Sequence, residues 1–209
     1  MNYRVLLLWL LIGIPGWAAA SPCSLLIVGD SLSSGYGLAP GQSWVDRLGE
    51  RLKRRAPAWH VVNASISGDT TQNGLLRLQP ALDRHHPQGV LLELGGNDAL
   101  RGTPPGTIRQ NLVTLIRQAR AAGAWVALLE APVLPNYGKP YAEAVAKLYV
   151  DVAREEKIVR VPCFVCGVAI EPGMMQADGI HPNEKAQGKM LDAVWPYIKP
   201  KLRCPVNKP

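Results

Sequence analysis

The chain has 209 residues, of which 47% are hydrophobic, and it carries a formal net charge of +7 at pH 7. This length and composition suit one domain with a buried core and argue against a disordered chain or two domains of ordinary size. The positive charge does not indicate a nucleic-acid partner, because no basic segment carries the interleaved aromatic residues of a nucleic-acid module.

The first twenty residues are typical of a secretory signal peptide. Arg4 gives a short positive start, residues 5–14 are apolar, and residues 18–20 are the small alanines that signal peptidase requires. An apolar run of about ten residues is too short to span a bilayer. We therefore expect cleavage after Ala20, a single domain over residues 21–209 without a stable membrane anchor, and a periplasmic or secreted protein.

Apolar runs alternate with amphipathic runs along the rest of the chain, which predicts strands that alternate with helices. The predicted strands are residues 25–29, a run from 61 onward, 90–94, 125–129 and 158–161. The predicted helices are residues 44–55, 75–82, 141–153, about 184–198, and one that Thr107 caps and Gly123 ends. Short buried strands between helices favour a parallel sheet covered on both faces. The sequence therefore predicts an α/β, flavodoxin-like fold with strand order 2-1-3-4-5.

Polar residues cluster directly after the first three predicted strands, and a fourth cluster stands after strand five, at the far end of the chain. The clusters are residues 29–33, 63–70, 95–98 and 178–183. The carboxyl ends of parallel strands meet at one edge of the sheet, where folds of this kind bind ligands. We therefore expect the four clusters to lie together and to form the functional site.

A serine, a histidine and an aspartate from these clusters fit nucleophilic catalysis. Acyl transfer by serine needs a base within reach of its hydroxyl and a group that orients the base. Asp178 and His181 are three residues apart, so the carboxylate can reach one imidazole nitrogen while the other faces Ser31. The Asn97 amide and backbone N–H groups beside glycines such as Gly68 supply donors for an oxyanion.

Other polar residues near these clusters are interpreted as structural or solvated. The flanking acids are expected to stabilise turns: Asp30, Asp69 and Asp98. The rival bases are expected to be solvated: His60, His85 and His86. The sequence contains no G-x-S-x-G, Walker or H-E-x-x-H motif, so it gives no support to the hydrolase, nucleotide-binding or metalloprotease classes that those motifs mark.

The four clusters, in this order, resemble the GDSL or SGNH hydrolase family, whose four named residues match Ser31, Gly68, Asn97 and His181. Longer stretches look closest to the family's bacterial group of thioesterase I, lysophospholipase L1 and arylesterase: residues 62–70, 92–98, 135–138 and 178–183. The resemblance implies a three-layer fold, Ser31 as nucleophile, and an oxyanion hole made of the Ser31 N–H, the Gly68 N–H and the Asn97 side chain.

The resemblance also implies the reaction and its substrates. We expect hydrolysis of small acyl esters and thioesters, and of lysophospholipids, through an acyl-Ser31 intermediate without metal or cofactor. Apolar residues predict an acyl-chain wall: Leu75, Leu100, Pro132, Leu134 and Tyr137. The alternatives are a carbohydrate O-acetyl esterase on the same fold and a non-catalytic binding protein, which would lack Ser31 or His181. We expect a monomer.

The four cysteines of an exported chain favour disulfides. Cys23 precedes the first strand, whereas Cys163 and Cys166 follow the fifth, so a strand length of roughly 17 Å separates them. A disulfide tolerates only about 7 Å between Cα atoms. The last helix runs back towards the amino edge of the sheet and brings Cys204 near Cys23. This geometry predicts a Cys23–Cys204 disulfide.

Cys163 and Cys166 have the C-x-x-C spacing of a redox motif or of half a zinc site. The sequence offers neither a second metal half-site nor a thioredoxin-like context. We therefore expect a local bridge between these two cysteines or a free pair.

Overall fold

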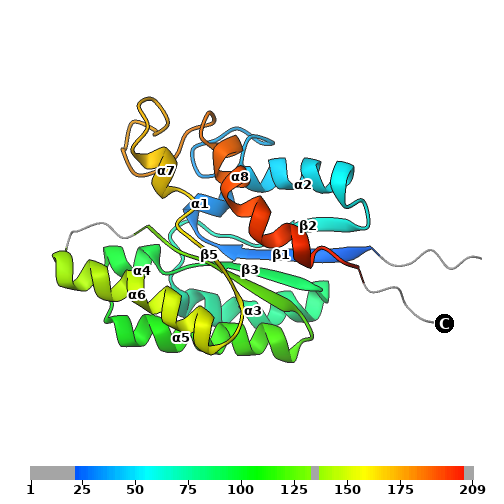
Figure 1. The fold of residues 1–209 in the computed structure, drawn as a ribbon, viewed down its shortest axis with the longest axis horizontal. Helices are drawn as coiled ribbons and strands as arrows, with labels where there is room; N and C mark the ends of the chain where they lie inside the picture. The colour runs from blue at the N-terminus through cyan, green and yellow to red at the C-terminus, as the bar shows by residue number, and fades with distance from the viewer. Residues whose placement is uncertain (1–21, 133–136, 205–209) are drawn as a thin grey trace, which may run out of the picture.

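The fold is built on a five-stranded parallel sheet, seen in a computed structural model that describes residues 22–132 and 137–204 (Figure 1). Its strands are β1 Cys23–Gly29, β2 Trp59–Asn63, β3 Gly89–Glu93, β4 Trp125–Leu129 and β5 Val159–Val161. They pair in the order β2-β1-β3-β4-β5, and every pairing is parallel. The predicted strand order is therefore confirmed. The predicted signal peptide lies outside the described residues.

Helices cover both faces of the sheet, which gives the fold three layers (Figure 1). One face is covered by α3 Thr71–His85, α5 Pro105–Ala121 and α6 Lys139–Glu155. The other face is covered by α2 Trp44–Arg55 and α8 Gln187–Ile198. Shorter helices lie in the connections: α1 Ser31–Ser34, α4 Gly96–Leu100 and α7 Cys166–Ala169. The 3-10 helix η2 Lys199–Lys201 directly follows α8.

The side chains of β1 divide between the two layers. Leu26 and Val28 belong to the core formed with α3, α5 and α6, and Leu25 and Ile27 to the core formed with α2 and α8. All four are fully buried. A strand covered on both faces is a continuous apolar run rather than an alternating one, and this is why the sequence pattern identifies β1.

One predicted cap is wrong. Thr107 does not cap its helix, because α5 begins two residues earlier, at Pro105, after Pro104 in the capping position. Proline suits a first helical position, since its ring fixes φ and the N–H it lacks would have no partner there. Thr107 lies in the first turn, where its N–H donates to the carbonyl oxygen of Pro104 at 2.9 Å.

The last helix begins at Gln187 rather than near residue 184. The buried Gln187 side chain accepts a hydrogen bond from the Trp44 N–H at 2.9 Å. It also donates to the carbonyl oxygens of Pro182 and Asn183, at 3.2 and 3.1 Å. These bonds tie the approach to α8 onto the start of α2 and hold residues 184–186 in a turn.

Both cysteine pairs are bridged. Cys23 and Cys204 form a disulfide with a Cα–Cα distance of 5.8 Å, which confirms the predicted pairing of these two cysteines. Cys163 and Cys166 form the local bridge, with a Cα–Cα distance of 5.5 Å.

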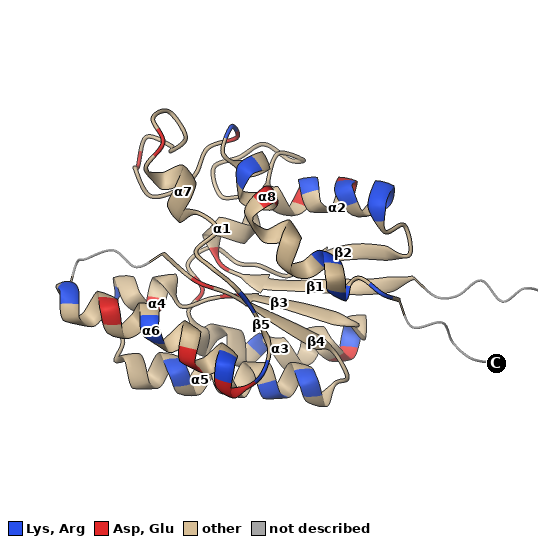
Figure 2. Ribbon diagram, viewed as in Figure 1, with Lys and Arg blue, Asp and Glu red and all other residues tan. Residues whose placement is uncertain are grey.

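Lys and Arg residues are spread over helices on both faces of the sheet (Figure 2). Several are paired with acids on neighbouring elements, as Arg51 is with Asp192 at 2.7 Å and Arg117 with Glu156 at 2.8 Å. Within residues 22–132 and 137–204, no helix has both the length and the apolar character needed to cross a bilayer.

The Cys23–Cys204 disulfide should contribute strongly to stability, because its partners are 181 residues apart in the sequence. Replacing both cysteines by serine (C23S/C204S) is expected to lower the free energy of unfolding by roughly 2–5 kcal/mol, since the unfolded chain is no longer constrained by the cross-link. Guanidinium denaturation of the oxidised parent and of this variant measures the difference. Equal midpoints and slopes would show that the bridge does not stabilise the fold.

Candidate active site

The predicted residues meet at the carboxyl edge of the sheet, Ser31 and Asn97 just after strands and Asp178 and His181 on a longer connection. Ser31 is the first residue of α1, directly after β1 and Asp30. Asn97 lies in α4, which follows β3 after Gly95, and Asp178 and His181 lie in the connection between α7 and α8. Gly95 has φ +116°, and a Cβ there would collide with the hydroxyl of Tyr149, so only glycine fits this turn.

Ser31, His181 and Asp178 form a continuous hydrogen-bonded chain. The His181 Nε2 atom lies 2.9 Å from the Ser31 Oγ atom, and the Nδ1 atom lies 2.7 Å from the Asp178 Oδ2 atom. The carboxylate cannot donate, so the Nδ1–H donates to it and the Nε2 lone pair faces the Ser31 hydroxyl. This arrangement can remove the proton of the serine hydroxyl as the oxygen attacks.

Asp178 is held as a carboxylate by its local turn. Its Oδ1 atom accepts the backbone N–H groups of His181 at 3.0 Å and Ile180 at 2.9 Å. The His181 backbone N–H, the His181 ring and the Ile180 N–H together lower the pKa of Asp178 to about 2. The ring of Tyr36 packs against the imidazole with a centroid distance of 4.6 Å.

Two of the three predicted oxyanion donors are backbone groups. Within the described residues, neither the Ser31 N–H nor the Gly68 N–H has an acceptor. Gly68 has φ +84°, a left-handed conformation that glycine adopts without strain.

The third predicted donor, the Asn97 side chain, is already engaged. Its Nδ2 atom donates to the Asp30 Oδ2 atom and to the backbone carbonyl oxygen of Asp69, each at 3.0 Å. Both amide hydrogens therefore have acceptors. To stabilise an oxyanion, the amide must share or exchange its bond to the Asp69 carbonyl.

Asp30 and Glu93 form a buried carboxyl pair beneath Ser31. Burial raises the pKa of Asp30 to about 6 and that of Glu93 well above its usual range, and the charge of Asp30 raises the pKa of Glu93 further. The Glu93 Oε2 atom accepts from the Ser33 hydroxyl at 2.7 Å and from the Asp30 N–H at 3.3 Å. Glu93 is not among the residues predicted from the sequence, although a lone acid in the apolar run of β3 is a signal of a buried ionisable group.

The flanking acids stabilise turns, as predicted. Asp30 caps α1 through the Leu32 N–H at 3.0 Å, and Asp98 accepts the Thr71 N–H at 2.8 Å. Asp69 forms an ion pair with Arg77, which the sequence analysis also missed. The Arg77 guanidinium donates to the carbonyl oxygens of Ala64 and Gly29, so it links the turns after β2 and β1.

The rival histidines lie away from this site. His60 is exposed on β2, His85 is half-buried at the last position of α3, and His86 is exposed just beyond it. Among the described residues, no group of three or more His, Cys, Asp or Glu side chains is arranged to hold a metal ion.

A mainly apolar cavity of about 180 Å³ adjoins Ser31 and His181. Leu100 and Pro132, two of the residues predicted for an acyl-chain wall, line it. Leu75 instead packs against the core, and Tyr137 is exposed beside Tyr141, with ring centroids 5.4 Å apart. Leu134 lies outside the described residues. Four further residues that follow β5 also line the cavity and are not predicted from the sequence: Val165, Ala169, Met175 and Ile180.

A larger hollow of about 750 Å³ lies between the ends of α2 and α8 and is lined by Arg51, Arg54, Trp195 and Lys199 among others. Its lining includes none of Ser31, Asp178 and His181, so the smaller cavity is the one that adjoins the predicted triad.

The chain is similar to known hydrolases over most of its length. Residues 27–189 match the model of the GDSL-like Lipase/Acylhydrolase family. Esterase TesA of Pseudomonas aeruginosa is 49% identical over 183 residues, which are 88% of this chain and 91% of that protein. Thioesterase 1/protease 1/lysophospholipase L1 of Escherichia coli K12 is 39% identical over 204 residues, 96% of this chain and 97% of that one.

A solved structure shows the same similarity. The psychrotrophic esterase EstA from Pseudoalteromonas sp., inhibited by monoethylphosphonate, superposes with a TM-score of 0.82 at 36% identity and covers 86% of this chain and 98% of its own.

The carboxyl pair should make stability depend on pH. Both folded-state pKa values are raised, so the pair favours folding at low pH, and this contribution is lost as the pH rises from about 4 through 6 and above. Glu93→Gln keeps the hydrogen bonds without the charge. The difference in free energy of unfolding, variant minus parent, should therefore be roughly 1–3 kcal/mol larger at pH 7 than at pH 4.

Denaturant unfolding across this pH range measures the effect. The exposed Glu184→Gln is the matched control and should show no comparable increase. Curves for Glu93→Gln that run parallel to those of the parent would contradict a raised pKa of Glu93 in the folded protein.

Proposed function

Because this chain belongs to the GDSL-like lipase/acylhydrolase family and is an ester-hydrolysing enzyme, we propose that Ser31 is its nucleophile, with His181 and Asp178 completing the triad. The observation that carries this proposal is the hydrogen-bonded chain from the Ser31 hydroxyl through His181 to the Asp178 carboxylate.

The proposed reaction proceeds in two acyl-transfer steps. The Ser31 oxygen attacks the carbonyl carbon of the ester while His181 takes the hydroxyl proton. The tetrahedral intermediate collapses, the alcohol or thiol leaves with the proton from His181, and an acyl-Ser31 ester remains. Water then attacks this ester with His181 again as base, which releases the carboxylic acid and restores the Ser31 hydroxyl. No step calls for a metal or a cofactor.

The proposed oxyanion hole combines the Ser31 N–H, the Gly68 N–H and the Asn97 amide. The first two are supported by having no acceptor among the described residues. Asn97 is supported by its fixed position beside Asp30. Preorganised donors of this kind act on the charge that develops in the transition state.

The proposed substrates are acyl esters, acyl thioesters and lysophospholipids. The apolar lining of the cavity beside Ser31 supports an acyl chain, whereas a carbohydrate would need polar partners there. Thioester and lysophospholipid hydrolysis is supported by the name of the Escherichia coli relative. We propose that the enzyme acts as a monomer.

Export to the periplasm or beyond is also part of the proposal. It is supported by the signal-like residues 1–20 and by the two disulfides, which form and persist in oxidising compartments.

Replacing the nucleophile tests the proposal directly. Ser31→Ala is expected to lower kcat for p-nitrophenyl esters by at least about three orders of magnitude, because only binding and oxyanion contributions remain. Covalent labelling by an organophosphonate should be lost in the same variant. Ser34→Ala, on the same short helix, is the matched control and should keep both activity and labelling. Labelling that survives in Ser31→Ala would exclude Ser31 as nucleophile.

Asn97→Ala tests the oxyanion hole. Loss of its amide is expected to lower kcat by about 10²–10³ with little change in KM, since the donor acts mainly in the transition state. Steady-state kinetics on the same esters measure both constants, and denaturant unfolding checks that the variant is folded. A change confined to KM would show that Asn97 contacts the substrate instead.

A further inference from the structure

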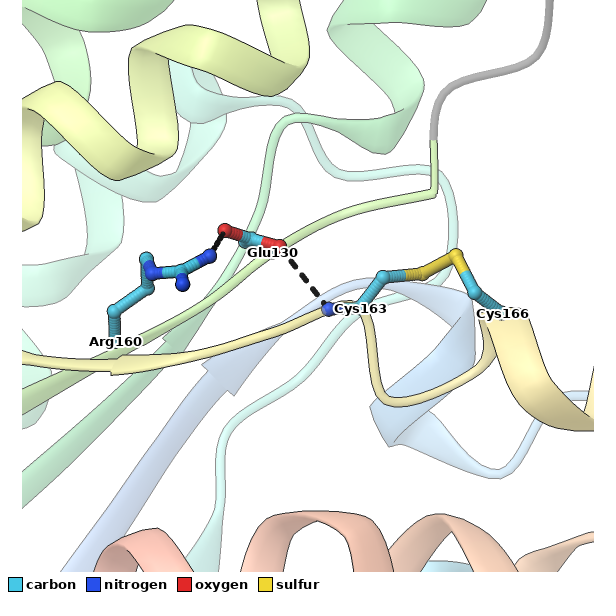
Figure 3. The surroundings of a disulfide bond; sticks show 4 residues. All are labelled: Glu130, Arg160, Cys163 and Cys166. Carbon is cyan, nitrogen blue, oxygen red and sulfur yellow. Dashed lines mark hydrogen bonds and ion pairs between the residues drawn. A yellow bond between two sulfur atoms is a disulfide. The ribbon is translucent and has the colours of Figure 1, made fainter.

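The turn that follows β5 carries a disulfide next to the acyl cavity. Cys163 and Cys166 bridge across Phe164 and Val165 (Figure 3). Val165 lines the cavity beside Ser31, and so does Ala169, which ends the short helix α7 that begins at Cys166. The bridge therefore closes the turn that supplies part of the cavity wall.

The same turn is anchored at its base. The Glu130 Oε2 atom accepts the Cys163 N–H at 3.1 Å, and its other carboxylate oxygen pairs with Arg160 on β5 (Figure 3). The buried Phe164 ring packs edge-on against Trp44 of α2, with centroids 5.5 Å apart. Val165 is thus held between an anchored residue on one side and a covalent bridge on the other.

The rest of this wall has little regular structure to support it, apart from an isolated antiparallel bridge between Met175 and Pro182. Between the end of β5 at Val161 and the start of α8 at Gln187, the four-residue helix α7 is the one helix among the described residues. This connection nevertheless supplies Met175 and Ile180 of the wall, as well as the Asp178–His181 segment. A turn fixed at its first residues limits how far such a connection can move.

We propose that the Cys163–Cys166 disulfide, anchored through Glu130, is a specificity-determining element that fixes Val165 and Ala169 in the acyl cavity and thereby sets the preference for acyl-chain length. The inference rests on the proposed function, because it requires that the acyl chain occupies this cavity.

The two disulfides act on different properties of the protein. Cys163 and Cys166 are three residues apart in the sequence, whereas Cys23 and Cys204 are 181 apart. Closing a short loop removes much less entropy from the unfolded chain than closing a long one. The local bridge therefore acts chiefly on the shape of the cavity, and the bridge between the chain ends acts on global stability.

The experiment compares kcat/KM for p-nitrophenyl acetate, butyrate and octanoate in the parent and in C163S/C166S. The ratio of octanoate to acetate is expected to change by about five-fold or more, mainly through KM of octanoate, because single methylene contacts in a pocket discriminate by about ten-fold or more. The acetate value should stay within about two-fold, since a short acyl group does not reach the wall.

C23S/C204S is the matched control. It also loses one disulfide, but its cysteines lie at the opposite edge of the sheet, so the octanoate-to-acetate ratio should stay within about two-fold of the parent. Glu130→Ala keeps the bridge and removes its anchor, and it should shift the ratio in the same direction as C163S/C166S. If C163S/C166S does not fold, the ratio measured for Glu130→Ala tests the inference in its place.

A folded C163S/C166S with the ratio of the parent would overturn the inference and leave the proposed function intact. A parent enzyme that hydrolyses none of the three esters would instead contradict the proposed function. A ratio that changes equally in both double variants would assign the effect to general loss of stability and would also overturn the inference.

Discussion

The buried carboxyl group of Asp30 holds together the parts of the site that come from different strands. One of its oxygens caps α1 through the Leu32 N–H, and the other accepts the Asn97 amide at 3.0 Å. The backbone N–H of Asp30 donates to the Glu93 carboxyl group at the end of β3. Asp30 therefore anchors both Ser31, the next residue in the chain and the proposed nucleophile, and Asn97, the proposed oxyanion side chain.

This anchor requires a close approach between β1 and β3. A Cβ on Gly29 would lie 2.7 Å from the Glu93 Oε2 atom and 2.9 Å from the Ser33 Oγ atom, so the last residue of β1 must be glycine. The parallel pairing of Gly29 with Glu93 supplies that approach. The sheet thus contributes more than a scaffold, because its register sets the distance between the two buried carboxyl groups.

The sequence predicts the parts of the molecule that depend on local pattern. Three of the polar clusters follow apolar strands directly, and the fourth comes later in the chain, after the last strand. Because parallel strands bring their carboxyl ends together, the sheet order and the meeting of Ser31 with His181 could be inferred. The cavity wall could not, because Val165 and Ile180 lie on a connection whose path is set by distant contacts. The bond between Gln187 and Trp44, 143 residues apart, is one of these. Glu93 could not be predicted because its role depends on burial beside Asp30, and the spacing of apolar residues does not indicate which side chains are buried together.

The hydrogen bond between Asn97 and the Asp69 carbonyl affects how strongly the proposed oxyanion hole prefers the transition state over the bound substrate. In the resting site the amide already donates to a neutral carbonyl oxygen, so exchanging that acceptor for the neutral carbonyl of a substrate gains little. A hydrogen bond to an oxyanion is roughly twice as strong as one between neutral groups. The exchange therefore becomes favourable only as negative charge develops on the substrate oxygen. An interaction that strengthens in the transition state raises kcat, whereas one that is equal in both states lowers only KM. The engaged Asn97 amide is thus suited to binding the transition state in preference to the substrate.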